Sequence, residues 1–270
     1  MSRPIRVVVH GALGRVGKEV VNATCKDPDL ELVGAVDAKA DGNTIPLPVG
    51  SGTVPLAKSL DSILTRTEPR VIVDFSGAEA SLAMVRLAAK HRVNLVIGTT
   101  GFSTENLEEI DRLAKANGVG AVVASNFALG AVLMIHLAKI AARYFDNAEI
   151  IELHHDQKLD APSGTAVSTA KAISEARGKP FVHPKVQKET VAGARGAELQ
   201  GVALHSVRLP GLMAHQEVIF GTSGQTLIIR HDTINRECYM PGVVMAVKKV
   251  VELKGLTIGL DRLLGLQQRG

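Results

Sequence analysis

Residues 152–166 place two histidines, a lysine and an aspartate directly before a Pro-Ser-Gly-Thr turn. Imidazole is the commonest general acid or base in proteins, and a lysine adds a proton donor or a partner for a carboxylate. The turn favours a helix start, whose first N–H groups and hydroxyls can hold an anion. The residues of this predicted acid/base site are His154, His155, Lys158, Ser163, Gly164 and Thr165.

The two adjacent histidines do not predict a metal site. Neighbours on a strand point to opposite faces, so His154 and His155 cannot easily serve one ion together. No third ligand follows at helical or ribbon spacing, and we expect no metal. A structural interpretation stays open for each residue: one histidine caps the strand, Lys158 is solvated, and Ser163 is only a helix cap.

A glycine-rich turn near the N-terminus predicts a second site, for a dinucleotide. Gly11, Gly14 and Gly17 form a GxxGxxG variant of the Rossmann fingerprint between an expected strand and an expected helix. Glycines let the backbone turn tightly and approach a pyrophosphate at the positive end of the helix. Asp37 ends the next strand about 20 residues later, where the fingerprint expects an acid for a ribose hydroxyl.

Two further turns belong to the same expected site, because ligands of parallel sheets bind beyond the carboxyl ends of the strands. Ordinary strand-to-helix turn chemistry is the alternative for both turns. The residues expected to contact the cofactor are Gly11, Ala12, Leu13, Gly14, Arg15, Val16, Asp37, Gly98, Thr99, Thr100, Ser125, Asn126 and Phe127. Asp37 alone favours NADH, whereas Lys39 either reaches the 2′-phosphate of NADPH or stands in solvent, so the cofactor stays open.

The first 125 residues alternate short apolar runs with helical patterns, which is typical of a parallel sheet covered on both faces. Nearly continuous apolar runs predict strands at Ile5–Val9, Leu32–Asp37, Val71–Phe75, Asn94–Ile97 and Ala121–Ala124. Helices are expected at Arg15–Lys26, Glu79–His91 and Thr104–Asn117. The Gly-, Pro- and Thr-rich residues 40–58 predict an irregular excursion.

Near residue 127 the pattern changes, which predicts a second α+β domain with a mixed sheet. Helices are expected at Leu129–Phe145 and Thr165–Arg177, and strands at Glu149–His154, Ala203–Leu209, Glu217–Phe220 and Thr226–His231. Residues 179–201 are predicted to form a loop. A valine-rich helix at Pro241–Leu253, stopped by Gly255, needs an apolar surface to pack against.

Composition limits the class of protein. With 46% hydrophobic and 21% charged residues the chain can bury a core, and only 3% aromatic residues argue against single-stranded nucleic-acid binding. A net charge of +4 suits an anionic small molecule. No apolar run predicts a signal peptide or a membrane span, and the two cysteines form no CxxC. We expect a cytoplasmic protein with no nucleic-acid or membrane partner.

The run His154-His155-x-x-Lys158-x-Asp160-Ala161-Pro162-Ser163-Gly164-Thr165-Ala166 resembles the signature of the 4-hydroxy-tetrahydrodipicolinate reductase (dihydrodipicolinate reductase) family. The three glycine- and polar-rich turns match that family's cofactor segments in the same order. The resemblance implies reduction of a cyclic imine dicarboxylate with NADH or NADPH, in lysine and diaminopimelate biosynthesis. It implies His154 as acid/base and Lys158 as proton donor, with His155, Gly164 and Thr165 on the substrate.

The resemblance also implies an architecture. An N-terminal Rossmann domain at residues 1–127, completed by a C-terminal return at 237–270, precedes a substrate-binding and oligomerisation domain at 128–236 whose sheets assemble a homotetramer. Three positions depart from the family pattern: Val16 replaces a methionine, Ala38 stands where some members hold a 2′-phosphate with arginine, and the loop around His215 differs. We interpret His215 as a structural histidine.

Two other functions fit part of the sequence. Another Rossmann oxidoreductase acting on an amino-acid precursor would keep the cofactor turns, but gives no reason for His-His-x-x-Lys beside Pro-Ser-Gly-Thr. A nucleotide-sensing protein would need only the first domain and an interaction surface, and the sequence contains no basic helix that would serve as one. The reductase is therefore the predicted function.

Overall fold

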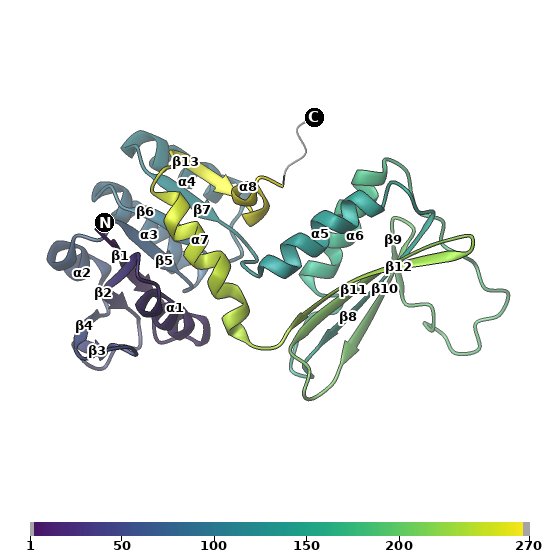
Figure 1. Cartoon of the computed structure of the whole chain (residues 1–270), viewed down its shortest axis with the longest axis horizontal. Helices are drawn as coiled ribbons and strands as arrows, with labels where there is room; N and C mark the ends of the chain where they lie inside the picture. The colour runs from purple at the N-terminus through teal and green to yellow at the C-terminus, as the bar shows by residue number, and fades with distance from the viewer. Residues whose placement is uncertain (1–2, 267–270) are drawn as a thin grey trace. The chain divides into compact units, whose positions relative to one another are not determined.

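The computed structural model describes residues 3–266 and divides the chain into two compact units (Figure 1). The first unit runs up to Leu129 and resumes at Arg236, and the second unit is Gly130–Asn235. Among the residues described, no helix has both the length and the apolar character needed to cross a membrane.

The first unit is built on an eight-stranded sheet in the order β13-β7-β6-β5-β1-β2-β4-β3. All neighbouring strands are parallel except β3 and β4. The strand order reverses between β1 and β5, which makes their carboxyl ends the topological switch point. The strands are β1 (Ile5–His10), β2 (Leu30–Val36), β3 (Thr44–Pro46), β4 (Thr53–Ala57), β5 (Val71–Asp74), β6 (Asn94–Ile97), β7 (Gly120–Val123) and β13 (Gly255–Ile258).

Helices connect these strands, and their ends follow from local chemistry. Helix α4 starts at a capping box in which Ser103 and Asn106 exchange hydrogen bonds, and it ends at Gly118 in the left-handed conformation. Helix α7 has Pro241 in its first turn and packs against α1 and strands β5 to β7. The helices are α1 (Arg15–Lys26), α2 (Leu60–Thr67), α3 (Ala78–Lys90), α4 (Thr104–Asn117), α7 (Met240–Val250), α8 (Leu260–Leu264) and the 3-10 turn η1 (Arg236–Tyr239).

The predicted parallel sheet is confirmed, but the local predictions for residues 40–58 and for Gly255 were incomplete, and helix α2 was missed. The expected irregular excursion contains β3 and β4, and α2 follows it. Gly255 begins β13 and does not stop the helix, which ends at Val250: the Gly255 N–H donates to Val119 O at 2.9 Å, at the edge of the sheet. Helix α2 buries Leu60, Ile63 and Leu64 at helical spacing, so the sequence did contain a signal for it. Strands β3, β4 and β13 are short and are held by pairing with other strands, which local patterns do not reveal.

The second unit is a five-stranded mixed sheet in the order β12-β11-β8-β10-β9, with α5 and α6 on one face (Figure 1). Only β8 and β10 are parallel. Met134, Ile150, Ile173 and Phe220 form the core between helices and sheet. The elements are α5 (Leu129–Ala141), β8 (Asn147–His154), α6 (Gly164–Arg177), β9 (Ala197–Leu199, within the expected loop), β10 (Val202–Arg208), β11 (Ala214–Thr222) and β12 (Gln225–Thr233).

Candidate active site

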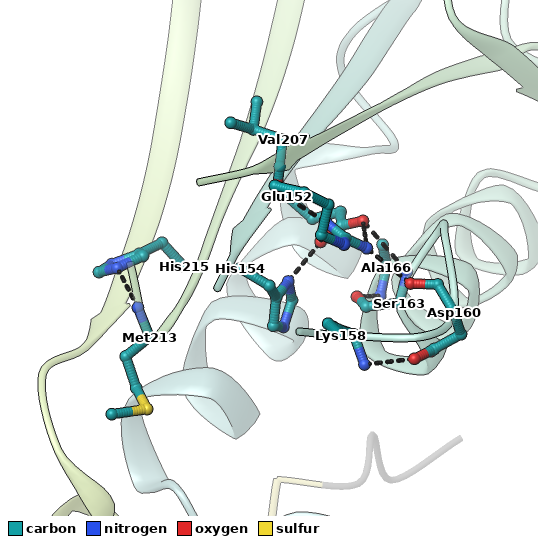
Figure 2. Close-up of polar contacts among 10 residues, drawn as sticks. Glu152, His154, Lys158, Asp160, Ser163, Ala166, Val207, Met213 and His215 are labelled. Atoms are coloured by element: carbon teal, nitrogen blue, oxygen red, sulfur yellow. Dashed lines mark hydrogen bonds and ion pairs between the residues drawn. The ribbon is translucent and has the colours of Figure 1, made fainter. Parts of the chain in front are cut away.

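Glu152 lies at the centre of the predicted acid/base site. It belongs to the central strand β8, on the side that faces the helices, and its side chain is 0% exposed. Arg208, at the end of β10, donates from Nη2 to Oε1 at 2.7 Å and from Nη1 to Oε2 at 3.0 Å. The carboxylate also accepts from His154 Nδ1 and from the Ser163 backbone N–H at 3.3 Å (Figure 2).

These partners keep Glu152 ionised. Burial alone raises the pKa of the Glu152 carboxyl, but hydrogen bonds from Arg208, Ser206 and His154 outweigh it, so the pKa is lowered overall. A buried charge is tolerated only when it is paired and hydrogen-bonded, and the planar arginine fork meets that need with two parallel bonds. Glu152 is thus an anion beside His154 near neutral pH.

The same geometry fixes the state of His154, whose side chain is 14% exposed. Burial lowers the pKa of His154, the charges of Lys158 and Arg208 lower it further, and Glu152 partly opposes them. The ring is therefore neutral near pH 7. Because ionised Glu152 can only accept, Nδ1 carries the hydrogen and Nε2 keeps a lone pair for a proton.

Lys158 stands on the loop between β8 and α6, as Figure 2 shows. Its Nζ donates to Asp160 Oδ1 at 2.7 Å, and Arg208 Nη2 donates to Asp160 O at 2.7 Å, which ties the loop to the end of β10. Asp160 is 57% exposed, and an ion pair with such a partner contributes only about 0–1 kcal/mol. Lys158 can therefore exchange Asp160 for an incoming carboxylate at little cost.

The start of α6 combines a satisfied cap with open space. The Ser163 hydroxyl is buried and accepts from the Ala166 N–H at 3.2 Å, so it acts as the helix cap. Gly164 is exposed, and a Cβ built on it would meet no atom within 4 Å. Protein packing therefore does not require glycine there, and half-buried Thr165 follows it in the first turn. His155 directly follows the last residue of β8.

The glycine turn of the first unit fits a dinucleotide. Gly11 has φ +81°, and a Cβ on Gly17 would lie 2.0 Å from Gly11 O, so both glycines are needed for the tight turn and close helix packing. Gly14 is the N-cap of α1 and offers no side-chain cap, and the first turn contains no acidic residue. The first N–H groups of α1 thus face no competing anion.

Asp37 braces this turn as well as ending the second predicted strand. Its buried carboxylate accepts from the Leu13 N–H at 2.8 Å and from the Lys39 N–H at 2.9 Å. Each carboxylate oxygen has a second lone pair, so both retain capacity for a ribose hydroxyl.

A cavity of about 370 Å³ opens at the switch point between β1 and β5. It brings together five predicted cofactor residues, Arg15, Val16, Gly98, Thr99 and Thr100, and adds Phe75, Ser76 and Gly77, which sequence reasoning missed. Their place directly after a parallel strand was a usable signal. Ser125, Asn126 and Phe127 follow β7 and are not part of its lining. The Phe127 ring instead packs 5.8 Å from the Phe75 ring.

Two other histidines of the second-unit sheet, His205 and His215, bond to carboxylates. His215 Nδ1 pairs with Asp232 Oδ1 at 2.6 Å, and its Nε2 accepts from the Met213 N–H at 3.3 Å, which agrees with a structural role. His205 pairs with Glu149 at 2.9 Å. Over residues 3–266 no group of three His, Cys, Asp or Glu side chains could hold a metal ion.

Comparison with known proteins relates both units to one family. The family models described as dihydrodipicolinate reductase, N-terminus and C-terminus, match residues 5–127 and 130–264. Proteins named 4-hydroxy-tetrahydrodipicolinate reductase from Dehalococcoides mccartyi strain BAV1, Moorella thermoacetica and Bacillus subtilis are 57%, 52% and 47% identical to this chain. These alignments cover 97–98% of this chain and 99% of each relative.

Solved structures give the same relationship. A dipicolinate-bound dihydrodipicolinate reductase from Paenisporosarcina sp. TG-14 is 43% identical, with a TM-score of 0.86 over 96% of this chain and 99% of that one. An amine dehydrogenase from Mycobacterium smegmatis, at 17% identity and a TM-score of 0.67, shares the fold over 98% of this chain and 97% of its own.

Titration of His154 tests the electrostatics of the site. We expect a pKa below that of an ordinary histidine. The variant Glu152→Gln should lower it further, because the anion that favours imidazolium is removed, and Lys158→Gln should raise it, because a repelling cation is removed. Imidazole proton shifts followed by NMR against pH measure both changes.

His91, which faces Asp61 in the first unit, serves as an internal control for global effects. A His154 pKa that moves in the same direction in both variants, or in neither, would contradict this account.

Proposed function

The chain belongs to the dihydrodipicolinate reductase family, and on that premise we propose which of its residues carry the reaction. It reduces the cyclic imine dicarboxylate 4-hydroxy-tetrahydrodipicolinate to tetrahydrodipicolinate with NADH or NADPH, in lysine and diaminopimelate biosynthesis. The observation that carries the residue assignment is the Glu152–His154 pair beside Lys158 and the open first turn of α6.

His154 and Lys158 are the proposed catalytic residues. In this reaction the 4-hydroxyl group leaves as water, a bound NADH or NADPH would supply a hydride to the ring, and the adjacent carbon must gain a proton. Lys158 carries N–H donors on a loop held by Arg208, and we assign it as the proton donor. His154, oriented through Nδ1 by Glu152, exchanges protons at Nε2 as the acid/base.

The proposed substrate site lies at the start of α6. The N–H groups of Gly164 and Thr165 and the positive end of this 14-residue helix favour a carboxylate in the open space before Gly164. His155 is the proposed second contact. Ser163 contributes by capping the helix, so its influence on the substrate passes through the turn that it holds.

The proposed cofactor site is the glycine turn with the cavity beside it. Gly11, Ala12, Leu13, Gly14, Arg15 and Val16 would hold the pyrophosphate, Asp37 a ribose hydroxyl, and Gly98, Thr99 and Thr100 the opposite wall. Ser125, Asn126 and Phe127 complete the proposal; Asn126 Oδ1 accepts from the Ala128 N–H at 2.8 Å and stiffens that turn.

Initial-rate kinetics test the catalytic assignment. His154→Ala and Lys158→Ala should each lower kcat by about 10²-fold or more, as general acid or base groups contribute, with little change in NADH affinity. The assay generates the substrate from pyruvate and aspartate semialdehyde with a dihydrodipicolinate synthase and follows cofactor absorbance.

Gly164→Ala is the matched variant at the substrate turn. Its methyl group enters space that no protein atom uses, so we expect normal folding, a raised KM for the substrate and a smaller effect on kcat. Wild-type turnover in His154→Ala or Lys158→Ala would exclude that residue from catalysis. An unchanged KM in Gly164→Ala would exclude the start of α6 from the substrate site.

Cofactor choice is tested at Asp37. Asp37→Asn removes the charge but keeps an acceptor for Leu13 N–H, so NADH should bind less well relative to NADPH. A hydrogen bond to a charged group contributes about 1.5–3 kcal/mol, which corresponds to a shift of about tenfold or more in the ratio of dissociation constants. Lys39→Gln is the companion variant and weakens NADPH alone if Lys39 reaches the phosphate. Equal changes for both cofactors in Asp37→Asn would exclude Asp37 from the ribose site.

We further propose that four copies assemble through the face of the second sheet opposite α5 and α6. That face carries Ile228, which is 56% exposed, beside the ion-paired Arg230, Glu217 and Asp232. Light scattering should give a mass near four times the 28.5 kDa of one chain, and Ile228→Glu should reduce it. A monomer at micromolar concentration would contradict this assembly.

A cytoplasmic location is the last proposal, and it is supported by the membership of the chain in a family of biosynthetic reductases that use NADH or NADPH. Immunoblots of fractionated cells should find the protein with cytoplasmic markers, and recovery outside the cytoplasm would overturn the proposal.

A further inference from the structure

Asp74, the last residue of β5, is a fully buried carboxylate with no role in the chemistry described above. Its side chain is 0% exposed and gathers donors from three places in the chain. His10 Nδ1 lies 2.6 Å from Oδ1, the Ser76 hydroxyl donates to Oδ1 at 2.6 Å, and the Thr99 hydroxyl donates to Oδ2 at 2.7 Å.

The three partners stand at the carboxyl ends of three adjacent strands. His10 ends β1, Ser76 follows β5, and Thr99 follows β6, in the order β6-β5-β1. The Ser76 backbone N–H also donates to Thr99 Oγ1 at 3.1 Å, which closes the network. Asp74 therefore links the ends of β1, β5 and β6 at the switch point. Without it, the loops alone would have to hold these strand ends at their observed distances.

The network determines the position of the cavity wall. Ser76 and Thr99 both line the cavity, together with Phe75 and Gly98, whereas Asp74 does not reach it. Packing already constrains the same wall, because a Cβ on Gly98 would lie 2.0 Å from the Phe75 ring. Packing of Phe75 against Gly98 limits how closely the turns after β5 and β6 approach each other. The Asp74 carboxylate, through Ser76 and Thr99, holds the two turns in place relative to one another.

The charge on Asp74 is consistent with this geometry. Burial raises the pKa of the Asp74 carboxyl, but the bonds from His10, Ser76 and Thr99 outweigh it and the pKa is lowered overall. As an anion Asp74 accepts from all three groups at once, so His10 donates from Nδ1. The Thr99 hydroxyl gives its only hydrogen to Asp74 and accepts from Ser76, which leaves it no hydrogen for a ligand.

We infer that Asp74 is a positioning residue for the nicotinamide cofactor, acting through Ser76 and Thr99 with His10 as the third anchor. The inference rests on the proposed cofactor site. It assigns the Thr99 hydroxyl to the hydrogen-bond network of the protein and not to direct contact with the cofactor. Because NADH and NADPH differ only in a 2′-phosphate, the network should affect the binding of both equally.

Cofactor fluorescence titrations on the whole protein test this role. Thr99→Val removes the hydroxyl and should raise the dissociation constants of NADH and NADPH by about tenfold each, whereas Thr99→Ser restores the hydroxyl and should bind both within about twofold of wild type. Asp74→Asn should weaken both cofactors by a similar factor, in contrast to Asp37→Asn, and should leave the substrate KM nearly unchanged.

A double variant separates positioning from direct contact. If Asp74 and Thr99 act as one unit, Asp74→Asn with Thr99→Val should bind cofactor no worse than the weaker single variant. Fully additive losses would mean that Thr99 contacts the cofactor independently, and the inference would fail. If Asp74→Asn does not fold, equal affinities in Thr99→Val and Thr99→Ser still overturn the inference.

Gly77→Val distinguishes failure of the inference from failure of the site. Gly77 is exposed, has an extended backbone and has open space at its Cβ position, so valine should fold and obstruct the cavity. Lost binding in Gly77→Val with unchanged binding in Thr99→Val would keep the site and reject the positioning role. Unchanged binding in Gly77→Val would reject both.

Discussion

An ionised carboxylate cannot stay buried without partners, and the second unit is arranged around that constraint at Glu152. Arg208 satisfies it from a neighbouring strand, His154 from the same strand, and Ser163 from the start of α6. The groups that stabilise this one charge therefore bring His154, the loop that carries Lys158 and the N-terminus of α6 together at the end of β8. The hydrogen bonds that compensate for the lost hydration of Glu152 also hold the residues of this site in fixed positions.

The first unit meets the same constraint with hydroxyl, imidazole and backbone N–H groups instead of arginine. Two hydroxyls and an imidazole surround Asp74, and backbone N–H groups surround Asp37. No lysine or arginine side chain takes part in these bonds, which suits a site for an anionic dinucleotide whose charge is to be met by a helix terminus. In the second unit Arg208 pairs with Glu152, and the Lys158 ammonium pairs instead with the exposed Asp160.

Local chemistry made much of this predictable. Apolar runs predicted the central parallel strands, and the Pro-Ser-Gly-Thr turn predicted the start of α6, because each signal lies within a few residues. The pairs Arg208–Glu152 and His10–Asp74 join residues 56 and 64 positions apart, and no spacing rule reveals them. Glu152 itself was within reach of sequence reasoning, since residues two apart on a strand share a face with His154.

Different glycines of the chain are subject to different evolutionary constraints. Gly11 and Gly17 are demanded by the fold itself, because any side chain there collides with backbone. Gly164 collides with nothing in the protein. In a gene duplicate that is no longer selected for this reaction, Gly164 could be replaced without harm to folding, whereas Gly11 and Gly17 would be retained. Replacement of Gly164 in a descendant would therefore indicate a change of substrate while the fold was still unchanged.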